Sequence, residues 1–320
     1  MFQRILIPLD GSPRAEQAVP VAARIARASG GSVLLLQVVS PPIDYGGGLA
    51  QAPLMMEQVI ETELAVASSY LDRVAKAREL TGIETTTDVM FGLPAQDILA
   101  VAESRSVDLI VMCSHGRTGF TRWVLGSVAQ KVVRQSPVPV FVLREGEAVP
   151  PASHTDAARP ISALVTLDGS PLAEAALAPA ANLVAALAAS ARGALHLTQV
   201  VKPFSTTADE GFVTQLNAEA VERAKTYLVS VTERLQGTYK DLNLSITWSV
   251  VRDADAADAI IHTAEQGEQG EGAEGFTGCD LIAMSTHGRG GLERWVMGSI
   301  TERVLSATKL PLLVVRPEKK

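Results

Sequence analysis

Two stretches of the sequence share a polar pattern: a hydroxyl residue followed by His-Gly-Arg, with a Gly-Ser pair that follows the glycine of His-Gly-Arg after nine intervening residues. They are Ser114-His115-Gly116-Arg117 with Gly126-Ser127, and Thr286-His287-Gly288-Arg289 with Gly298-Ser299. Glycine lets a ligand approach backbone N–H groups closely, and a helix that begins at the serine offers unpaired N–H groups and a favourable dipole to an anion. The pattern therefore predicts a phosphate-binding loop in each half of the chain. In a single copy, a simple turn and helix cap would explain the same residues.

An aspartate follows the first strand-like run of each half. Ile7-Pro8-Leu9-Asp10-Gly11-Ser12-Pro13 recurs as Val165-Thr166-Leu167-Asp168-Gly169-Ser170-Pro171. Each aspartate could contact a ligand or cap the helix expected near the following proline. The two roles can coexist.

These motifs belong to a duplicated domain, because the closing run Pro139-Val140-Phe141-Val142-Leu143-Arg144 also recurs as Pro311-Leu312-Leu313-Val314-Val315-Arg316. We expect domain 1 over 1–145, a linker rich in Pro, Ala and polar residues over 146–159, and domain 2 over 160–320. Domain 2 carries two insertions, of which the larger is a Gly/Glu/Gln-rich stretch over 265–272 that is typical of a loop.

Short β-branched runs alternate with helical patterns in each copy. In domain 1 the expected strands are 4–9, 32–39, 84–91, 108–113 and 138–143, and the expected helices include 15–29, 57–81 and 95–104. This alternation predicts an α/β fold, with two tandem doubly wound parallel-sheet domains of five strands each. Ligands of such sheets bind beyond the carboxyl ends of the strands, where the loops after the first and fourth strands carry the repeated motifs.

The composition is that of a globular protein, with 47% hydrophobic and 20% charged residues. The formal net charge of -7 gives no general attraction to nucleic acid or to an anionic membrane, so we expect neither partner. The sequence shows no signal-peptide pattern, no apolar run near the ~20 residues of a membrane span, and two cysteines without CxxC spacing. These features indicate a cytoplasmic protein.

The repeated motifs resemble the universal stress protein family and its nucleotide-binding signature, Gly-x2-Gly-x9-Gly-Ser/Thr. The resemblance covers nearly the whole chain in two copies. It implies a Rossmann-like, adenine nucleotide α-hydrolase-like fold and a site for ATP or another adenine nucleotide, alone or with Mg²⁺.

The family's binding residues transfer position by position. Asp10 would touch the ribose or a bound cation, and the Val38 backbone would meet the adenine. The implied site in domain 1 comprises Pro8, Leu9, Asp10, Val38, Met112, Cys113, His115, Gly116, Arg117, Gly126, Ser127 and Val128. The implied site in domain 2 comprises Thr166, Leu167, Asp168, Val200, Met284, Ser285, His287, Gly288, Arg289, Gly298, Ser299 and Ile300.

The sequence departs from the signature at its first glycine, which is Cys113 in domain 1 and Ser285 in domain 2. We expect the added Cβ to narrow the approach to the phosphates. Domain 2 departs further, since Gly92-Leu93-Pro94 has an acidic counterpart around Asp253 and Asp255. Domain 1 should therefore hold the better site.

We expect a non-enzymatic stress-response or regulatory protein that binds adenine nucleotide and at most hydrolyses ATP slowly. No carboxylate or nucleophile stands beside His115 or His287 to complete an acid–base set. An interaction scaffold with degenerate sites is the alternative, and an ATP-dependent ligase is a more distant one. In the family, the closing strand pairs subunits, so we expect the two domains to pair within the chain, while a homodimer of chains stays open.

Overall fold

The computed structural model describes residues 1–41, 52–114, 125–144, 160–189, 191–205, 210–267, 276–288 and 297–317. The chain divides into two compact units, Met1–Glu145 and Gly146–Lys320, which we call domain 1 and domain 2. The predicted linker, 146–159, lies outside the described residues.

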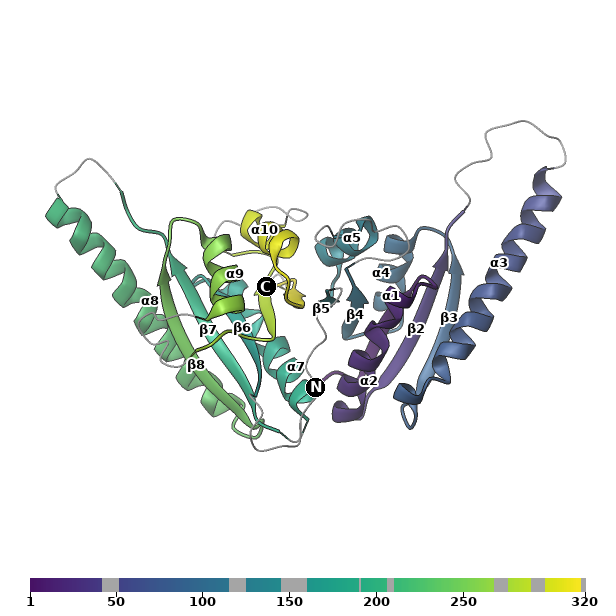
Figure 1. The fold of residues 1–320 in the computed structure, drawn as a ribbon, viewed down its shortest axis with the longest axis horizontal. Coiled ribbons are helices and arrows are strands. Elements are labelled where there is room, and N and C mark those ends of the chain that lie inside the picture. The colour runs from purple at the N-terminus through teal and green to yellow at the C-terminus, as the bar shows by residue number, and fades with distance from the viewer. Residues whose placement is uncertain are drawn as a thin grey trace. The chain divides into compact units, whose positions relative to one another are not determined.

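Domain 1 is built on a sheet in which every described strand pair is parallel, in the order β3-β2-β1-β4-β5 (Figure 1). Its strands are β1 (Arg4–Leu9), β2 (Ser32–Val39), β3 (Thr85–Phe91), β4 (Leu109–Cys113) and β5 (Val140–Leu143). The order reverses at β1, which lies between β2 and β4. This switch point is where a doubly wound sheet opens a ligand crevice.

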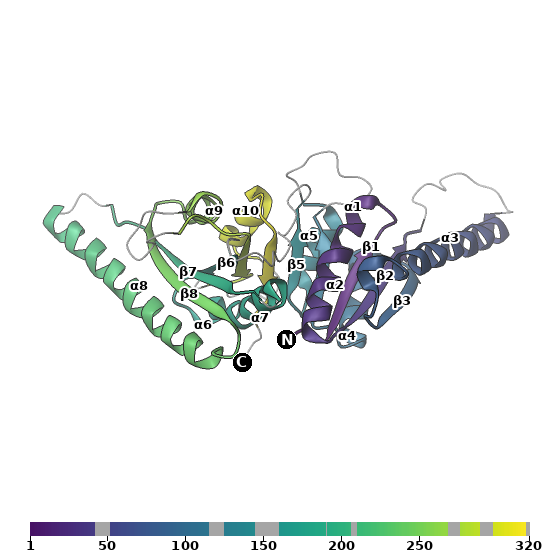
Figure 2. The same cartoon turned by 60° about the horizontal axis from the view of Figure 1, so that its bottom comes forward.

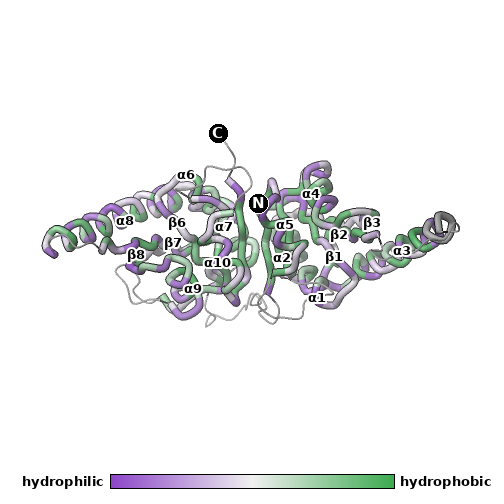
Figure 3. Tube along the Cα trace, turned by 90° about the horizontal axis from the view of Figure 1, so that it is seen from above, coloured by the Kyte–Doolittle hydropathy of each residue, from purple (hydrophilic) through white to green (hydrophobic). Residues whose placement is uncertain are grey.

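The helices of domain 1 cover both faces of the sheet, with α4 on the face opposite α1 and α3 (Figure 3). They are α1 (Pro13–Glu16), α2 (Ala18–Ser29), α3 (Ala52–Ala75), the 3₁₀ helix η1 (Arg78–Leu80), α4 (Pro94–Ser104) and α5 (Ser127–Gln135). Right-handed crossovers place α2 and α3 on one face, and α4 packs with α5 on the other.

Domain 2 repeats this topology in the order β10-β9-β6-β7-β8 (Figure 1). Its strands are β6 (Ile161–Leu167), β7 (Gly193–Val201), β8 (Leu244–Arg252), β9 (Leu281–Ser285) and β10 (Leu312–Val315). Its helices are α6 (Pro171–Glu174), α7 (Leu177–Ala188), α8 (Glu210–Thr238), α9 (Ala256–Gln266) and α10 (Ser299–Ala307). The predicted fold class, two tandem doubly wound domains of five strands, is confirmed.

Two predicted helices have different bounds in the structure. The helix expected over 15–29 is split into α1 and α2 at Gln17. Pro20 has no backbone N–H to donate to Glu16, which breaks the continuous helical ladder, and Pro179 breaks the ladder between α6 and α7 in the same way. The helix expected over 57–81 begins earlier, at Ala52, and ends at Ala75, before the turn of η1.

The cores consist of aliphatic strand residues sealed by small helix residues. Strand β4 is buried from Leu109 to Met112, and alanines such as Ala22 and Ala26 let α2 approach the sheet closely. Each fully buried leucine or isoleucine contributes roughly 1.5–3 kcal/mol relative to an exposed one. The outer helices α3 and α8 instead alternate between hydrophobic and hydrophilic segments along their length (Figure 3). The loops that carry the motifs therefore follow directly after strands that the packed core holds in place.

One described segment reaches the length and apolarity of a membrane span, which modifies the expectation from sequence. It is Pro171–Ala188, with 18 residues. The segment contains α6 and α7, and more than half of it is buried inside domain 2, where α7 packs on β6 and β7. Its apolar character is therefore explained by its place in the core.

Candidate functional site

The loop after the first strand of each domain is fixed by its aspartate and serine. The Asp10 carboxylate accepts hydrogen bonds from the backbone N–H of Ser12 at 3.0 Å and from its hydroxyl at 2.6 Å. Ser12 is the N-cap of α1 and accepts from the N–H of Ala15 at 3.2 Å. Gly11 has a φ of 82°, a left-handed conformation that favours glycine. The cap expected of Asp10 is therefore made by Ser12, which Asp10 holds.

The second motif places an open helix end at the carboxyl edge of β4. The N–H of Gly126 donates to the carbonyl of Ser114 at 2.8 Å, which brings the start of α5 back to the end of β4. Gly126 is the N-cap of α5 and has no side chain with which to cap it. The first N–H groups of α5 have no partner within the helix, so they and the helix dipole favour an anion.

A cavity of about 370 Å³ joins these two loops in domain 1. Its volume falls within the usual range for small-molecule sites, roughly 300–1,000 Å³. Nine residues proposed from sequence line it: Pro8, Leu9, Asp10, Val38, Met112, Cys113, Gly126, Ser127 and Val128. His115, Gly116 and Arg117 lie outside the described residues.

Cys113 points away from the open end of α5. Its thiol lies 3.9 Å from the carbonyl oxygen of Ala15 in α1, and successive strand side chains point to opposite faces, so Met112 faces the other side. Helices α1 and α5 cover opposite faces of the sheet. The Cβ at this position therefore leads toward α1, on the side of the cavity that Cys113 and Ala15 line, and the expected narrowing at the phosphates stays a prediction.

Domain 2 brings its corresponding loops into direct contact. The Asp168 carboxylate accepts from Ser170 at 2.9 and 2.6 Å, and Gly169 has a φ of 83°. A Cβ placed on Gly288 would lie 2.1 Å from the Asp168 Oδ2, so these two predicted residues touch. The N–H of Gly298 donates to the carbonyl of Thr286 at 2.9 Å.

Other predicted positions of domain 2 lie around the same edge of the sheet. Thr166 and Leu167 end β6, Val200 lies near the end of β7, and Met284 and Ser285 end β9. Ser299 and Ile300 begin α10, where Gly298 is the N-cap. Arg289 is outside the part of the chain that the structure describes.

His287 and Thr301 distinguish the polar surroundings of this second loop. The Nδ1 of His287 lies 2.9 Å from the Thr286 hydroxyl, and its Nε2 is buried without a hydrogen-bond partner among the described residues. The Thr301 hydroxyl donates to the carbonyl of Ser285 at 2.9 Å. Ala129, which lines the cavity of domain 1, holds the position equivalent to Thr301.

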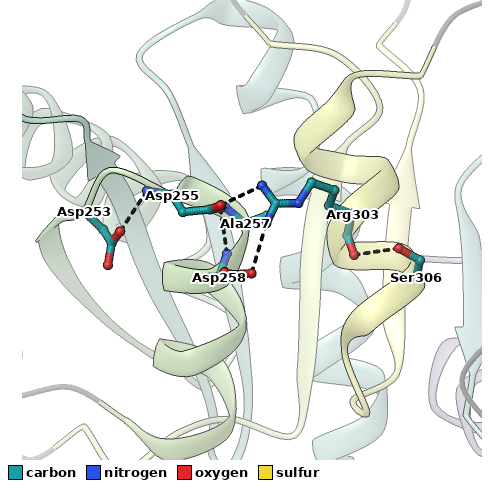
Figure 4. Close-up of polar contacts among 6 residues, drawn as sticks. All are labelled: Asp253, Asp255, Ala257, Asp258, Arg303 and Ser306. Atoms are coloured by element: carbon teal, nitrogen blue, oxygen red, sulfur yellow. Dashed lines mark hydrogen bonds and ion pairs between the residues drawn. The ribbon is translucent and has the colours of Figure 1, made fainter.

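The start of α9 is an acidic turn held by one arginine (Figure 4). Asp255 caps α9 by accepting from the N–H groups of Ala257 and Asp258 at 3.0 and 3.2 Å. Arg303 of α10 donates to the Asp255 and Asp258 carboxylates at 2.7 and 3.1 Å. The hydrogen bond from Arg303 is the main cause that lowers the pKa of Asp255. Domain 2 thus has a charged, capped turn where domain 1 has Gly92-Leu93-Pro94.

A further cluster, which the sequence interpretation missed, joins α1 to α3 beside Asp10. Arg73 pairs with Glu16 at 3.0 Å, and its guanidinium lies 5.1 Å from the centre of the Tyr70 ring. Burial is the main cause that raises the pKa of Tyr70, and the charges of Glu16 and Asp10 add to it.

Domain 2 repeats this cluster. The Tyr227 hydroxyl donates to Glu174 at 3.0 Å, and Arg234 pairs with the same carboxylate. The Ala-Glu and Tyr-Leu pairs that recur in both copies are the sequence signal for this contact.

The polar residues of the cavity that were not among the predicted site residues include Gln37 and Glu63. Gln37 comes from β2 and Glu63 from α3. Gln37 has a detectable signal, because a glutamine recurs at Gln199 in the second copy. Glu63 has none, since only the packing of α3 against the sheet brings it to the cavity.

Comparison with known families identifies the chain. The model of the universal stress protein family matches residues 1–144 and again 162–316. The chain belongs to the universal stress protein family. Its two matches correspond to the two sheets described above, which makes it a tandem member with two universal stress protein domains.

Similar universal stress proteins are found in bacteria and archaea. The chain is 25% identical over 321 residues to one from Mycolicibacterium smegmatis, covering 98% of this chain and 97% of the relative. It is 31% identical over 145 residues to one from Methanocaldococcus jannaschii, covering 45% of this chain and 84% of that protein. A crystal structure of a universal stress protein from Archaeoglobus fulgidus superposes with a TM-score of 0.60 at 18% identity, covering 99% and 97% of the two chains, which supports the fold.

Proposed function

We propose that domain 1 binds an adenine nucleotide, ATP, ADP or AMP, at the carboxyl edge of its sheet. The observation that carries the proposal is the uncapped N-terminus of α5, which opens into the cavity between the loops of β1 and β4. The phosphates lie at Gly126, Ser127 and Val128, and the nucleoside lies near Asp10 and Val38. Membership of the universal stress protein family supports the same ligand class.

Ligand binding gives this protein a regulatory role, without a chemical step beyond slow ATP hydrolysis. A nucleotide that binds only the folded protein stabilises it by mass action, so the occupied site reports the nucleotide level as added stability. Asp10 contacts the ribose or a Mg²⁺ ion that accompanies the phosphates. We assign the protein to the cytoplasm as a stress-response factor.

Domain 1 is the stronger site in this proposal. Its cavity ends at Pro94 and Ile98 of α4, which are uncharged. The matching end of domain 2 carries the carboxylates of Asp255 and Asp258 around α9, which disfavour an anionic ligand. Arg303 offsets part of that charge through its two ion pairs.

A matched pair of serine variants tests this assignment. Ser127→Ala removes the hydroxyl at the start of α5, and Ser299→Ala makes the same change at α10. With ATP in excess, we expect the native chain to gain thermal stability, with a smaller gain in Ser127→Ala and a nearly native gain in Ser299→Ala. No gain in the native chain, measured from 0.1 to 10 mM ATP by scanning calorimetry, would refute the proposal.

An interaction scaffold is the second candidate, and exposed apolar residues on the long helices favour it. Val66 of α3 is 61% exposed and Phe212 of α8 is 55% exposed. A scaffold with degenerate sites predicts no nucleotide binding by the native chain and measurable binding by Cys113→Gly. Nucleotide binding by the native chain would reject this alternative.

A further inference from the structure

A buried amide oxygen in the wall of the cavity has no hydrogen-bond partner among the residues that the structure describes. Gln37 lies two residues before the end of β2, lines the cavity and is only 8% exposed. Its Oε1 is fully buried and accepts no hydrogen bond from the described residues. Buried polar groups in folded proteins are nearly always paired, because an unpaired one loses its hydrogen bonds to water without gaining any within the protein. The unpaired amide therefore needs an explanation.

The same group recurs at the same place in domain 2. Gln199 of β7 is 7% exposed, and its Oε1 is likewise buried without a partner in the described part of the chain. Gln37 lies opposite Leu9 in the sheet register, and Gln199 lies opposite Leu167. Nearby strand positions differ between the copies, with Leu34 replaced by His196, so the two strands are not simply identical.

The side chains around Gln37 in the cavity accept hydrogen bonds, so a ligand on this side must donate them. The lining residues of the cavity include the carboxylates of Asp10 and Glu63, and they include no lysine or arginine among the described residues. Carboxylates accept hydrogen bonds, and an amide oxygen does the same. Phosphate oxygens are also acceptors, so they fit the N–H groups of α5 and not this side of the cavity.

We propose that Gln37 and Glu63 form an acceptor subsite that binds donor groups of the nucleoside and so determines which nucleotide is preferred. This proposal rests on nucleotide binding by domain 1. The donors are ribose hydroxyls or the exocyclic amine of the base, which share the chemistry that the subsite recognises. In this proposal the Gln37 amide turns toward the cavity when the ligand binds, so that its oxygen, buried in the ligand-free chain, accepts a hydrogen bond from one of these donors.

Calorimetric titration of the full chain with three nucleotides tests the subsite. ATP carries both donors, 2′-deoxy-ATP lacks one ribose hydroxyl, and inosine triphosphate lacks the amine. We expect the native chain to bind ATP more tightly than at least one analogue. Gln37→Leu should weaken ATP binding about threefold to tenfold, the loss typical of one hydrogen bond. It should weaken binding of the analogue that lacks the contacted donor less than about twofold.

Two further variants separate this subsite from general damage. Glu63→Gln changes an exposed helix residue, imposes no folding burden, and should reduce the preference for ATP over the same analogue. Gln199→Leu makes the equivalent substitution in domain 2 and should leave the domain 1 titration unchanged. In the absence of nucleotide, Gln37→Leu should unfold at the same or a higher temperature than the native chain, because it removes a buried amide oxygen that has no partner among the described residues.

The outcomes distinguish the subsite from the proposed function. Equal weakening of all three nucleotides by Gln37→Leu, or unchanged ATP binding in both Gln37→Leu and Glu63→Gln, would overturn the subsite while nucleotide binding stands. A lower unfolding temperature of ligand-free Gln37→Leu would mean that the amide has a structural partner, which also overturns it. A native chain that binds none of the three nucleotides would overturn both proposals.

Discussion

At the scale of single residues, His196 carries the clearest pH dependence. The ring is 1% exposed, its nitrogens lie 2.8 Å from the hydroxyls of Thr247 and Ser249, and it stacks on Phe276 at 3.8 Å. Burial lowers its pKa to about 4 from the usual 6.5. The folded protein therefore keeps this histidine neutral at pH values where the unfolded chain protonates it.

This shift predicts acid destabilisation of domain 2. Between pH 6.5 and 4 the unfolded chain binds a proton at His196 that the folded protein does not bind. The contribution of neutral His196 to the unfolding free energy is therefore fully present above pH 6.5. It is lost as the pH falls toward 4, by about 3 kcal/mol in total. His196→Leu should be less stable at pH 7.5, because the buried Ser249 hydroxyl and the Thr247 hydroxyl each lose a hydrogen-bond partner. It should also lose less stability than the native chain on acidification. Urea unfolding at several pH values gives the slope of the unfolding free energy against pH for the native chain and for His196→Leu. Equal slopes would contradict the role of His196 in acid destabilisation.

Gly288 provides a second prediction at this scale. In Gly288→Ala, the new Cβ meets the Asp168 carboxylate, which cannot move without disturbing its bonds to Ser170. We expect a loss of about 1–3 kcal/mol in the unfolding free energy, as is usual for overpacking. Gly237→Ala is the control, since nothing lies within 4 Å of its Cβ in α8, and it should add roughly 0.5–1 kcal/mol. A neutral Gly288→Ala would show that the two loops are not in contact.

At the scale of elements, the acidic turn of α9 combines a helix cap with an ion-pair fork. Asp255→Ala removes both the two backbone contacts and the bond to Arg303, whereas Asp258→Ala removes only one exposed ion pair. Exposed ion pairs contribute little, and asparagine is as good an N-cap as aspartate. The thermal midpoint should therefore fall most in Asp255→Ala and much less in Asp255→Asn and Asp258→Ala. A reversed order, measured by circular dichroism melts of the full chain, would contradict the capping role.

The elements themselves were largely predictable, because period and repetition act locally. Strands β1 and β2 have the predicted bounds, and α5 begins at the predicted Ser127. The division between α1 and α2 was missed because Pro20 removes the hydrogen bond to the carbonyl of Glu16, four residues earlier in the chain. The side of the sheet that the Cys113 side chain takes was not predicted, because the signature fixes the position in the sequence and strand alternation fixes the side. Glu63 was not predictable, because only the packing of α3 on the sheet brings it to the cavity. The recurring Ala-Glu and Tyr-Leu pairs mark the Glu16 cluster in both copies but do not show which arginine joins it.

At the scale of the whole molecule, each domain carries its own copy of the repeated motifs. All described residues of the domain 1 cavity lie within 8–129. A fragment of residues 1–144 should therefore bind ATP within about threefold of the full chain, while the fragment 160–320 should bind more weakly. Loss of binding in a folded 1–144 fragment would show that domain 2 contributes to the site. Pairing of the closing strands within one chain stays a prediction, which mass measurement in solution would test against a dimer of chains.

We propose that the cavity of domain 1 binds an adenine nucleotide through the open end of α5. Calorimetric titration of nucleotide-stripped full chain with ATP tests it most directly. We expect saturable binding with one dominant site per chain, weakened by Ser127→Ala and hardly affected by Ser299→Ala. The absence of heat of binding for ATP, ADP and AMP up to millimolar concentration, or equal sensitivity to both serine variants, would contradict it.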